Sequence, residues 1–185
     1  MIKAVAFDRD GTLIKHIPYL SNIKDVSILP TVVDALTVLK QHNILCFIVT
    51  NQSGIGRGFF SEEEYKIIES YLDSLFASYG ITFEKTYYCP YHPEHGLGDY
   101  KKDSNNRKPK PGMINQIMEE FNISNDEIVM IGDNKTDIES GQCVSIKSVL
   151  VRTGLGESFE SDVTVKPDYI ADSLIDAIEN YVLKQ

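Results

Sequence analysis

The chain has 185 residues, of which 42% are hydrophobic, so it is long enough to form one domain (1–185) with a sizeable core. Its formal net charge of −9 argues against nucleic acid as a partner, because such a surface needs a basic patch. No apolar run approaches the roughly 20 residues that span a bilayer, no signal-peptide layout opens the chain, and three widely spaced cysteines favour a reducing cytoplasm over a disulfide framework.

Strand-like and helix-like patterns alternate along the whole chain. Short apolar runs predict strands at about 2–7, 44–49, 83–88, 127–131, 147–151 and 169–170. Apolar residues at helical spacing predict helices from Pro30 to about 42, from 62 to 80, after Gly112, at about 136–143, and from 173 to about 183. The clearest helix start is Ser61 before three glutamates, an N-cap with an acidic first turn. This order predicts an α/β fold, a three-layer Rossmann-like parallel sheet with helices on both faces.

The first predicted strand ends in two carboxylates, Asp8 and Asp10, which are followed by Gly11. In an open α/β sheet, ligands bind at the carboxyl ends of the strands, so chemistry is expected here. Gly11 supplies the backbone freedom for a tight turn and for close approach of a ligand. Taken alone, the two carboxylates could equally cap a turn, as Asp commonly does.

The second predicted strand runs into Thr50, Asn51, Gln52 and Ser53, and three glycines follow within residues 54–58. Such a turn can direct backbone N–H groups and the Thr50 hydroxyl at a phosphate oxygen. The alternative is an ordinary glycine-rich loop.

Three cations lie within four residues at Arg107, Lys108 and Lys110. Two prolines stiffen this segment just ahead of a predicted helix, and a compact ammonium group suits the binding of a phosphoryl group. The alternative is a solvated basic loop.

Another apolar strand reaches a carboxylate at Asp133. Asp133 could complete an Mg²⁺ site with Asp8, since Mg²⁺ prefers hard oxygen ligands from one or two carboxylates, waters and phosphate. Asp137 could be a further ligand through water or could fix the loop, and we favour the loop.

In this order, the four segments resemble the motifs of the haloacid dehalogenase-like (HAD-like) phosphohydrolases over nearly the whole chain. The resemblance implies that Asp8 attacks phosphorus and that Asp10 shuttles the proton. It also implies that Thr50 and Lys108 hold the phosphoryl oxygens, and that Mg²⁺ is bound by Asp8, the Asp10 backbone carbonyl and Asp133. The gaps between the motifs leave no room for a separate cap domain, so loops must shape the site for a small soluble substrate.

Beyond the superfamily, the chain is similar to heptose bisphosphate phosphatases and their histidinol-phosphate phosphatase relatives. The segments that carry this similarity are FDRDGTL, VTNQSGIGRGFFSEEEY, YYCPYHPE, RKPKPGM and LVRTGLG. The similarity implies a phosphatase that removes the C7 phosphate of D-glycero-D-manno-heptose 1,7-bisphosphate in lipopolysaccharide or capsule precursor synthesis, and we expect a monomer. The alternatives are a phosphatase for histidinol phosphate or another small phosphomonoester, and a non-catalytic phosphosugar-binding module. Degenerate binders usually lose a charged catalytic group, and none is missing here.

The similarity also implies which residues contact the substrate. The sets are His16, Ile17, Pro18 and Tyr19 after the first motif, Thr50 to Ser53 around the phosphoryl group, Arg107 beside Lys108, and Asn134, which stands where a lysine is common. The chain departs from these relatives in loop 89–107, on the substrate side. That loop keeps Cys89 and His92 but has Ser104-Asn105-Asn106 where two further cysteines are usual. Structural zinc needs four nitrogen or sulfur ligands, so we expect none to be tightly bound.

Overall fold

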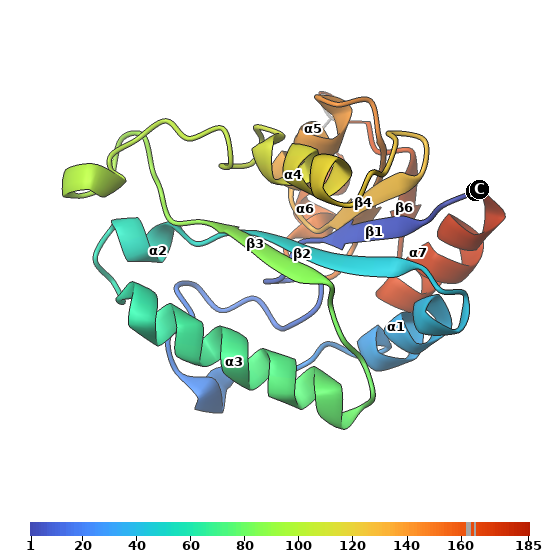
Figure 1. The fold of residues 1–185 in the computed structure, drawn as a ribbon, viewed down its shortest axis with the longest axis horizontal. Coiled ribbons are helices and arrows are strands. Elements are labelled where there is room, and N and C mark those ends of the chain that lie inside the picture. Colours follow the sequence, from blue (N-terminus) through green and yellow to red (C-terminus); the bar gives the residue numbers. More distant parts are fainter. Residues whose placement is uncertain (162–163, 165) are drawn as a thin grey trace.

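The computed structural model describes residues 1–161, 164 and 166–185, and its centre is a parallel sheet of six strands (Figure 1). The strands are β1 (Ala4–Phe7), β2 (Leu45–Asn51), β3 (Lys85–Cys89), β4 (Ile128–Gly132), β5 (Lys147–Val151) and β6 (Tyr169–Ala171). Their order across the sheet is β3-β2-β1-β4-β5-β6, and every neighbouring pair is parallel. The predicted α/β fold is therefore confirmed. The strand order reverses between β1 and β4, and ligands bind at such a switch point in open α/β sheets.

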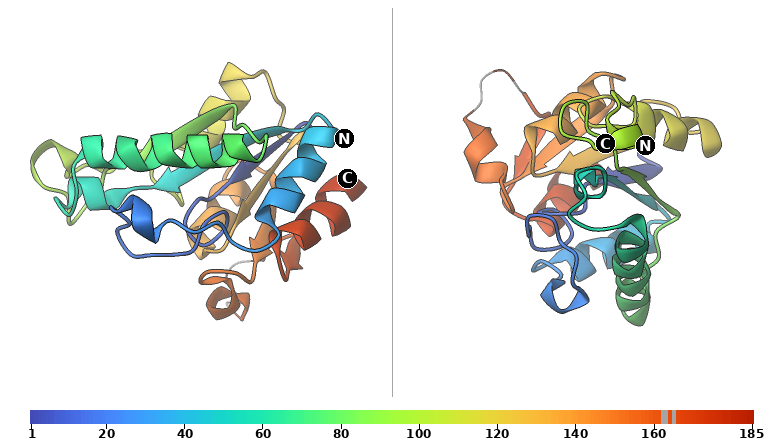
Figure 2. Two further views of the ribbon diagram at one scale, coloured as in Figure 1. Left: turned by 90° about the horizontal axis from the view of Figure 1, so that it is seen from below. Right: turned by 90° about the vertical axis from the view of Figure 1, so that its left-hand side faces the viewer.

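Helices cover both faces of the sheet (Figures 1 and 2). They are α1 (Val32–Gln41), α2 (Ser53–Gly56), α3 (Glu62–Ser78), α4 (Gly112–Glu120), α5 (Lys135–Gln142), α6 (Gly156–Glu160) and α7 (Leu174–Asn180), with 3₁₀ turns η1 (Ile23–Asp25), η2 (Gly98–Tyr100) and η3 (Val182–Lys184). Val5 and Phe7 of β1 pack in the core under α1, α3 and α7, whereas Ala4 and Ala6 pack in the core under α4. Because both faces of β1 are buried, its sequence is a continuous apolar run rather than an alternating one.

The elements differ from prediction mainly at their ends. The Ser61 cap is confirmed: its hydroxyl accepts from the Glu64 N–H at 3.1 Å, and the Glu64 carboxylate accepts from the Ser61 N–H at 2.7 Å. Pro30 does not open α1, which begins at Val32 after the N-cap Thr31. Neither α2 nor α6 was predicted, because four and five residues are too few to carry a helical apolar period.

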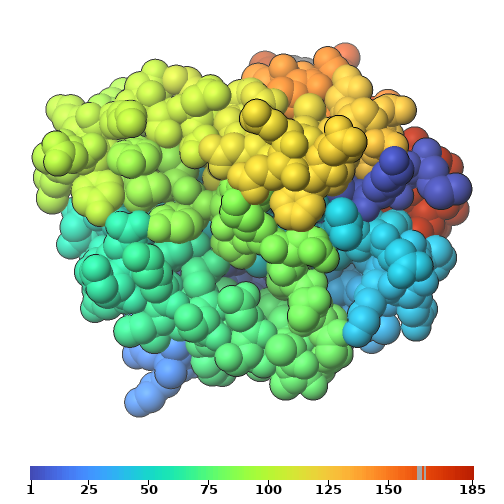
Figure 3. All heavy atoms as spheres, viewed as in Figure 1, coloured from blue at the N-terminus to red at the C-terminus, as the bar shows by residue number. Residues whose placement is uncertain are grey.

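The long loop after β3 packs on the α2 region, as the space-filling view shows (Figure 3). The Leu97 N–H donates to the Gly56 carbonyl at 2.8 Å. A Cβ atom at Gly56 would lie 2.4 Å from the Pro90 carbonyl oxygen, so the two segments could not approach this closely with a larger residue. Among the described residues, no helix combines the length and apolar character needed to cross a bilayer.

Candidate active site

Lys108 is the buried cation that joins the strand ends. Its Nζ atom donates to Asp8 Oδ1 at 2.5 Å, to the Val49 carbonyl at 2.7 Å, and lies 2.7 Å from Asp137 Oδ1. Asp8 follows β1, Val49 belongs to β2, and Asp137 lies in the first turn of α5. Only 4% of the Lys108 side chain is exposed, so this segment is not the solvated basic loop that the sequence left open.

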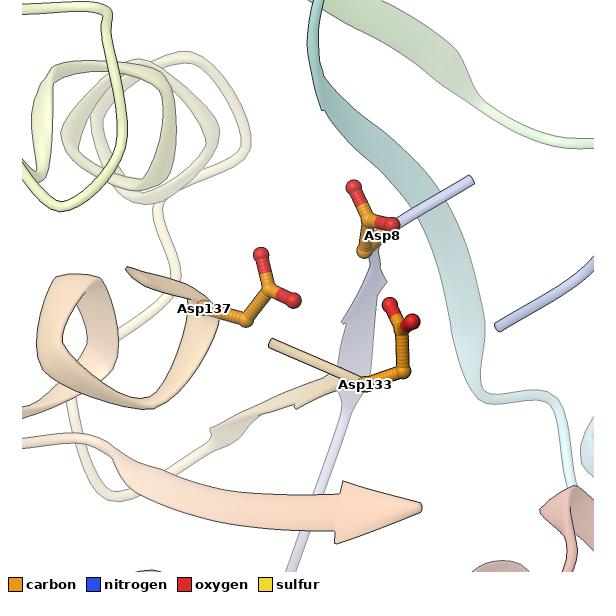
Figure 4. Close-up of side chains that lie close together, drawn as sticks. All are labelled: Asp8, Asp133 and Asp137. Carbon is orange, nitrogen blue, oxygen red and sulfur yellow. The ribbon is translucent and has the colours of Figure 1, made fainter. Parts of the chain in front are cut away.

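Three buried carboxylates face one another at the switch point between β1 and β4 (Figure 4). Asp8, Asp133 and Asp137 each offer an oxygen, and these oxygens lie within 4.8 Å of one another. Asp137 also accepts the Asn134 N–H at 3.0 Å, completing a capping box at the start of α5. It therefore holds the loop, as favoured from the sequence, and in addition pairs with Lys108 and joins the carboxylate cluster. A cluster of hard oxygen ligands of this kind suits Mg²⁺.

The carboxylates repel one another in this buried setting. Burial and the nearby Asp137 charge raise the pKa of Asp133 to about 6, and the Leu155 N–H offsets only part of that rise. Burial, together with the other carboxylates, also raises the pKa of Asp8, while the Lys108 ammonium opposes the shift. A single ammonium group thus balances three carboxylates, which leaves net negative charge for a divalent cation to neutralise. The donor set and its charge both fit Mg²⁺.

Magnesium is therefore expected to stabilise the protein more at about pH 7.5 than at about pH 5. An aspartate whose folded pKa is raised from 3.8 to about 6 loses folding stability as the pH rises through that window, because the folded state disfavours the charged form. Mg²⁺ binds that charged form. At about 100 times its dissociation constant it should raise Tm by about 5–10 °C near pH 7.5, and clearly less near pH 5. Thermal melting with and without Mg²⁺ measures this, and equal shifts at both pH values would contradict it.

Two glycines make room for the Asp133 side chain. Gly11 and Gly154 both have positive φ, and a Cβ atom at either would lie within 2.2 Å of Asp133 Oδ2. The Leu155 N–H donates to the same oxygen at 2.8 Å, and the Thr153 hydroxyl ties the two loops together by donating to the Gly11 carbonyl at 2.7 Å. No role was predicted for Thr153, Gly154 or Leu155 from the sequence. Their only signal was membership of the LVRTGLG segment.

Asp10 lies in the turn after β1 and is held by donors on two sides. Arg9 contacts both of its carboxylate oxygens, and Gln52 Nε2 donates to Oδ2 at 3.0 Å and to the Thr50 hydroxyl at 2.8 Å. Arg9 was not singled out from the sequence, although a charged residue between the two aspartates was the available signal.

Asn51 pairs with the backbone of Lys108. Its Nδ2 donates to the Lys108 carbonyl and its Oδ1 accepts the Lys108 N–H, both at 3.0 Å. This double hydrogen bond positions Lys108. A direct contact between Asn51 and substrate stays a prediction.

Two adjoining cavities open at this edge of the sheet. The smaller, about 140 Å³, is lined by Asp8, Thr50, Lys108, Asp133 and Asn134 among others. The larger, about 270 Å³, includes Arg9, Pro18, Tyr19, Gln52 and Ser53 in its lining. Asp10, His16 and Asn51 line both. The structure therefore brings every residue of the predicted site to one place except Arg107.

Arg107 lines neither cavity. Its guanidinium donates to the Tyr91 carbonyl at 3.3 Å and is half-buried.

Loop 89–107 contains one cysteine and two histidines. Burial raises the pKa of the Cys89 thiol, and Ser104 hydrogen-bonds to it. His92 Nδ1 accepts the Glu94 and His95 N–H groups. Within the described residues, the cysteine and histidines of this loop do not gather with other ligand atoms as the three aspartates do.

Comparison with known proteins adds family information to this geometry. A family model described as HAD-hyrolase-like matches residues 105–177. A D-glycero-beta-D-manno-heptose-1,7-bisphosphate 7-phosphatase from Haemophilus influenzae is 39% identical over 177 residues, covering 95% of each chain. The Vibrio cholerae protein of the same name is 38% identical, covering 98% of this chain and 96% of that one. A solved D,D-heptose 1,7-bisphosphate phosphatase from B. bronchiseptica, complexed with magnesium and phosphate, superposes with a TM-score of 0.89 over 100% of both chains at 22% identity.

Proposed function

The chain belongs to the D-glycero-D-manno-heptose-1,7-bisphosphate 7-phosphatase family of HAD-like hydrolases, and on that basis we propose that it removes the C7 phosphate of this sugar bisphosphate with Mg²⁺ as cofactor. The observation that carries the proposal is the Asp8–Lys108 pair at the switch point, beside the carboxylate cluster and a cavity of about 270 Å³. Both relatives named above carry the beta anomer in their names, so we propose the β anomer as the preferred substrate.

Asp8 is the proposed nucleophile. It lies at the end of β1, where the small cavity reaches it, and Lys108 holds one of its oxygens. Attack of the other oxygen on phosphorus forms an aspartyl phosphate as the bond to the sugar oxygen breaks, which divides a very slow hydrolysis into two easier steps. Lys108 and the Thr50 hydroxyl face the same cavity and would bind the phosphoryl oxygens.

Asp10 is the proposed acid and base. It lines both cavities, so it lies between the phosphoryl site and the space for the sugar. It would protonate the departing sugar oxygen and then accept a proton from the water that hydrolyses the aspartyl phosphate. His16, Tyr19 and Ser53 line the sugar side, and we propose them as substrate contacts. We propose Arg107 as a further contact, made by the guanidinium N–H groups that are not donated to the Tyr91 carbonyl.

Asp8, Asp133 and the Asp10 backbone carbonyl are the proposed magnesium ligands, with Asp137 adjacent to them. The ion would supply charge neutralisation between the carboxylates and the phosphate. Asp133 is oriented for this by the Leu155 N–H and the two glycine turns around it.

The purified protein is expected to release phosphate from the β-heptose bisphosphate with a kcat/KM at least about 10-fold above that for the α anomer and for histidinol phosphate. Phosphate release measured for the three substrates with Mg²⁺, and again with EDTA, tests this. Preference for histidinol phosphate would overturn the substrate assignment. No Mg²⁺-dependent release from any of them would overturn the enzyme, leaving a phosphosugar-binding module.

A further inference from the structure

The Asp10 carboxylate has one crowded oxygen and one nearly free oxygen. Oδ2 lies 2.9 Å from both Nε and Nη2 of Arg9 and accepts from Gln52 Nε2 at 3.0 Å. Among the described residues, the hydrogen bond that Oδ1 accepts is the longer one, from Arg9 Nη2 at 3.2 Å. The hydrogen bonds from Arg9 Nε and Gln52 Nε2 occupy both lone pairs of Oδ2, whereas Oδ1 retains one for a proton.

Arg9 is itself fixed from behind. Its side chain is 1% exposed, and its Nη1 donates to Glu69 Oε1 on α3 at 2.6 Å. The guanidinium carbon also lies 5.6 Å from the centre of the Tyr65 ring, one helical turn before Glu69. The guanidinium group of an arginine is planar and its donors are pre-organised. Here Glu69 holds one edge of that group while Asp10 accepts from the other.

Desolvation of the three charged groups Glu69, Arg9 and Asp10 costs folding free energy. One cation serves two carboxylates in a buried position, and burial raises the pKa of Glu69 despite the ion pair with Arg9. Replacing a buried ion pair with apolar residues is often neutral or stabilising, so attachment of α3 to the sheet does not by itself require these charges. What an apolar pair could not do is hold a carboxylate in one orientation.

We infer that Arg9 and Glu69 are positioning residues that orient Asp10 so that its Oδ1, rather than its Oδ2, exchanges the proton with the leaving group. This inference rests on the proposed phosphatase activity. In the first step, Asp10 Oδ1–H gives its proton to the sugar oxygen as the P–O bond breaks and Asp8 becomes phosphorylated. In the second, Oδ1 takes a proton from the attacking water as the aspartyl phosphate is hydrolysed. Arg9 and Glu69 exchange no proton in either step.

The leaving group distinguishes positioning from a purely structural role. A sugar alkoxide must be protonated as it departs, whereas the nitrophenolate of p-nitrophenyl phosphate leaves without a proton. Glu69→Gln and Arg9→Lys are therefore expected to lower kcat/KM for the heptose bisphosphate about 10- to 100-fold while changing kcat/KM for the aryl phosphate less than about 3-fold. We compare kcat/KM because it covers only the steps through phosphorylation of Asp8, whereas hydrolysis of the aspartyl phosphate is common to both substrates. Because both substrates are measured on one sample, the ratio does not depend on the fraction of folded protein.

Asp73→Asn is the matched control. Asp73 lies one turn after Glu69 on α3 and lines the same surface cavity of about 290 Å³ beside β3. The Asp73→Asn substitution should leave the ratio of kcat/KM for the two substrates at its wild-type value. Equal losses with both substrates, or no loss with either, would overturn the inference and leave the Arg9–Glu69 pair as a structural contact. If the wild-type protein hydrolyses neither substrate with Mg²⁺, the proposed function itself fails, which is a separate outcome.

Discussion

Asp8→Asn is expected to lower Mg²⁺-dependent turnover by at least about 10⁴-fold, because an amide cannot form the aspartyl phosphate. The fold should survive, since Asn has the same shape and burial already disfavours the Asp8 charge. Lys108 keeps Asp137 as a partner at 2.7 Å. Rapid acid quench after mixing with substrate labelled in the C7 phosphate should find labelled protein for the wild type and none for the variant.

Asp99→Asn provides a control of the same chemical change on the exposed turn η2, and wild-type turnover is expected for it. If Asp8→Asn keeps more than about 1% of wild-type turnover at an unchanged Tm, phosphorus is attacked by another group, such as a water molecule.

Lys108→Met is expected to remove activity and also to destabilise the fold by about 3–5 kcal/mol near pH 7.5, because Asp8 and Asp137 lose their buried cation. Burial works against the lysine charge, yet Asp137 and Asp8 together raise the pKa of Lys108, so the ammonium form is firmly held. The stability loss should shrink near pH 5. The pKa of Asp8 and of Asp133 is raised, so these carboxyls can be protonated there instead of remaining as unpaired charges.

Lys110→Met is the neighbouring control. The Lys110 side chain is 43% exposed and pairs at 2.6 Å with Asp103, so its replacement should change stability by less than about 1 kcal/mol. Urea unfolding of both variants at the two pH values measures these differences. A Lys108→Met protein as stable as Lys110→Met near pH 7.5 would mean that the three carboxylates do not depend on this cation.

The four central strands of the sheet could be predicted because they are buried on both faces. Runs such as Ile44 to Val49 are apolar without alternation, and each is followed by polar or glycine residues that end the strand. The short helices α2 and α6 could not be predicted, since four and five residues are too few to show a helical apolar period. The predicted start of α1 at Pro30 was wrong by two residues, because Thr31, with φ of 66°, takes the N-cap position and the helix begins at Val32.

The site was predictable to the extent that strand ends define it. Asp8, Thr50 and Asp133 each follow an apolar strand, so parallel topology brings them together. Contacts that depend on tertiary packing left no local pattern. Glu69 lies on α3, 60 positions from the arginine that it anchors, and no local sequence pattern distinguishes it from the other acids of that helix. Asn51 and Asp137 were noticed, but their bonds to Lys108 required a fold in which positions 57 and 29 residues apart meet.

The Asn51 amide has a consequence for redesign of this protein. By pairing with both the N–H and the C=O of Lys108, it imitates the backbone of an additional strand beyond the end of β2. Both ends of the loop between Cys89 and Arg107 are therefore fixed, the first by β3 and the second by the Asn51 amide. Foreign loops of different length grafted between these two fixed ends should change substrate specificity while leaving the Lys108 ammonium group in place beside Asp8.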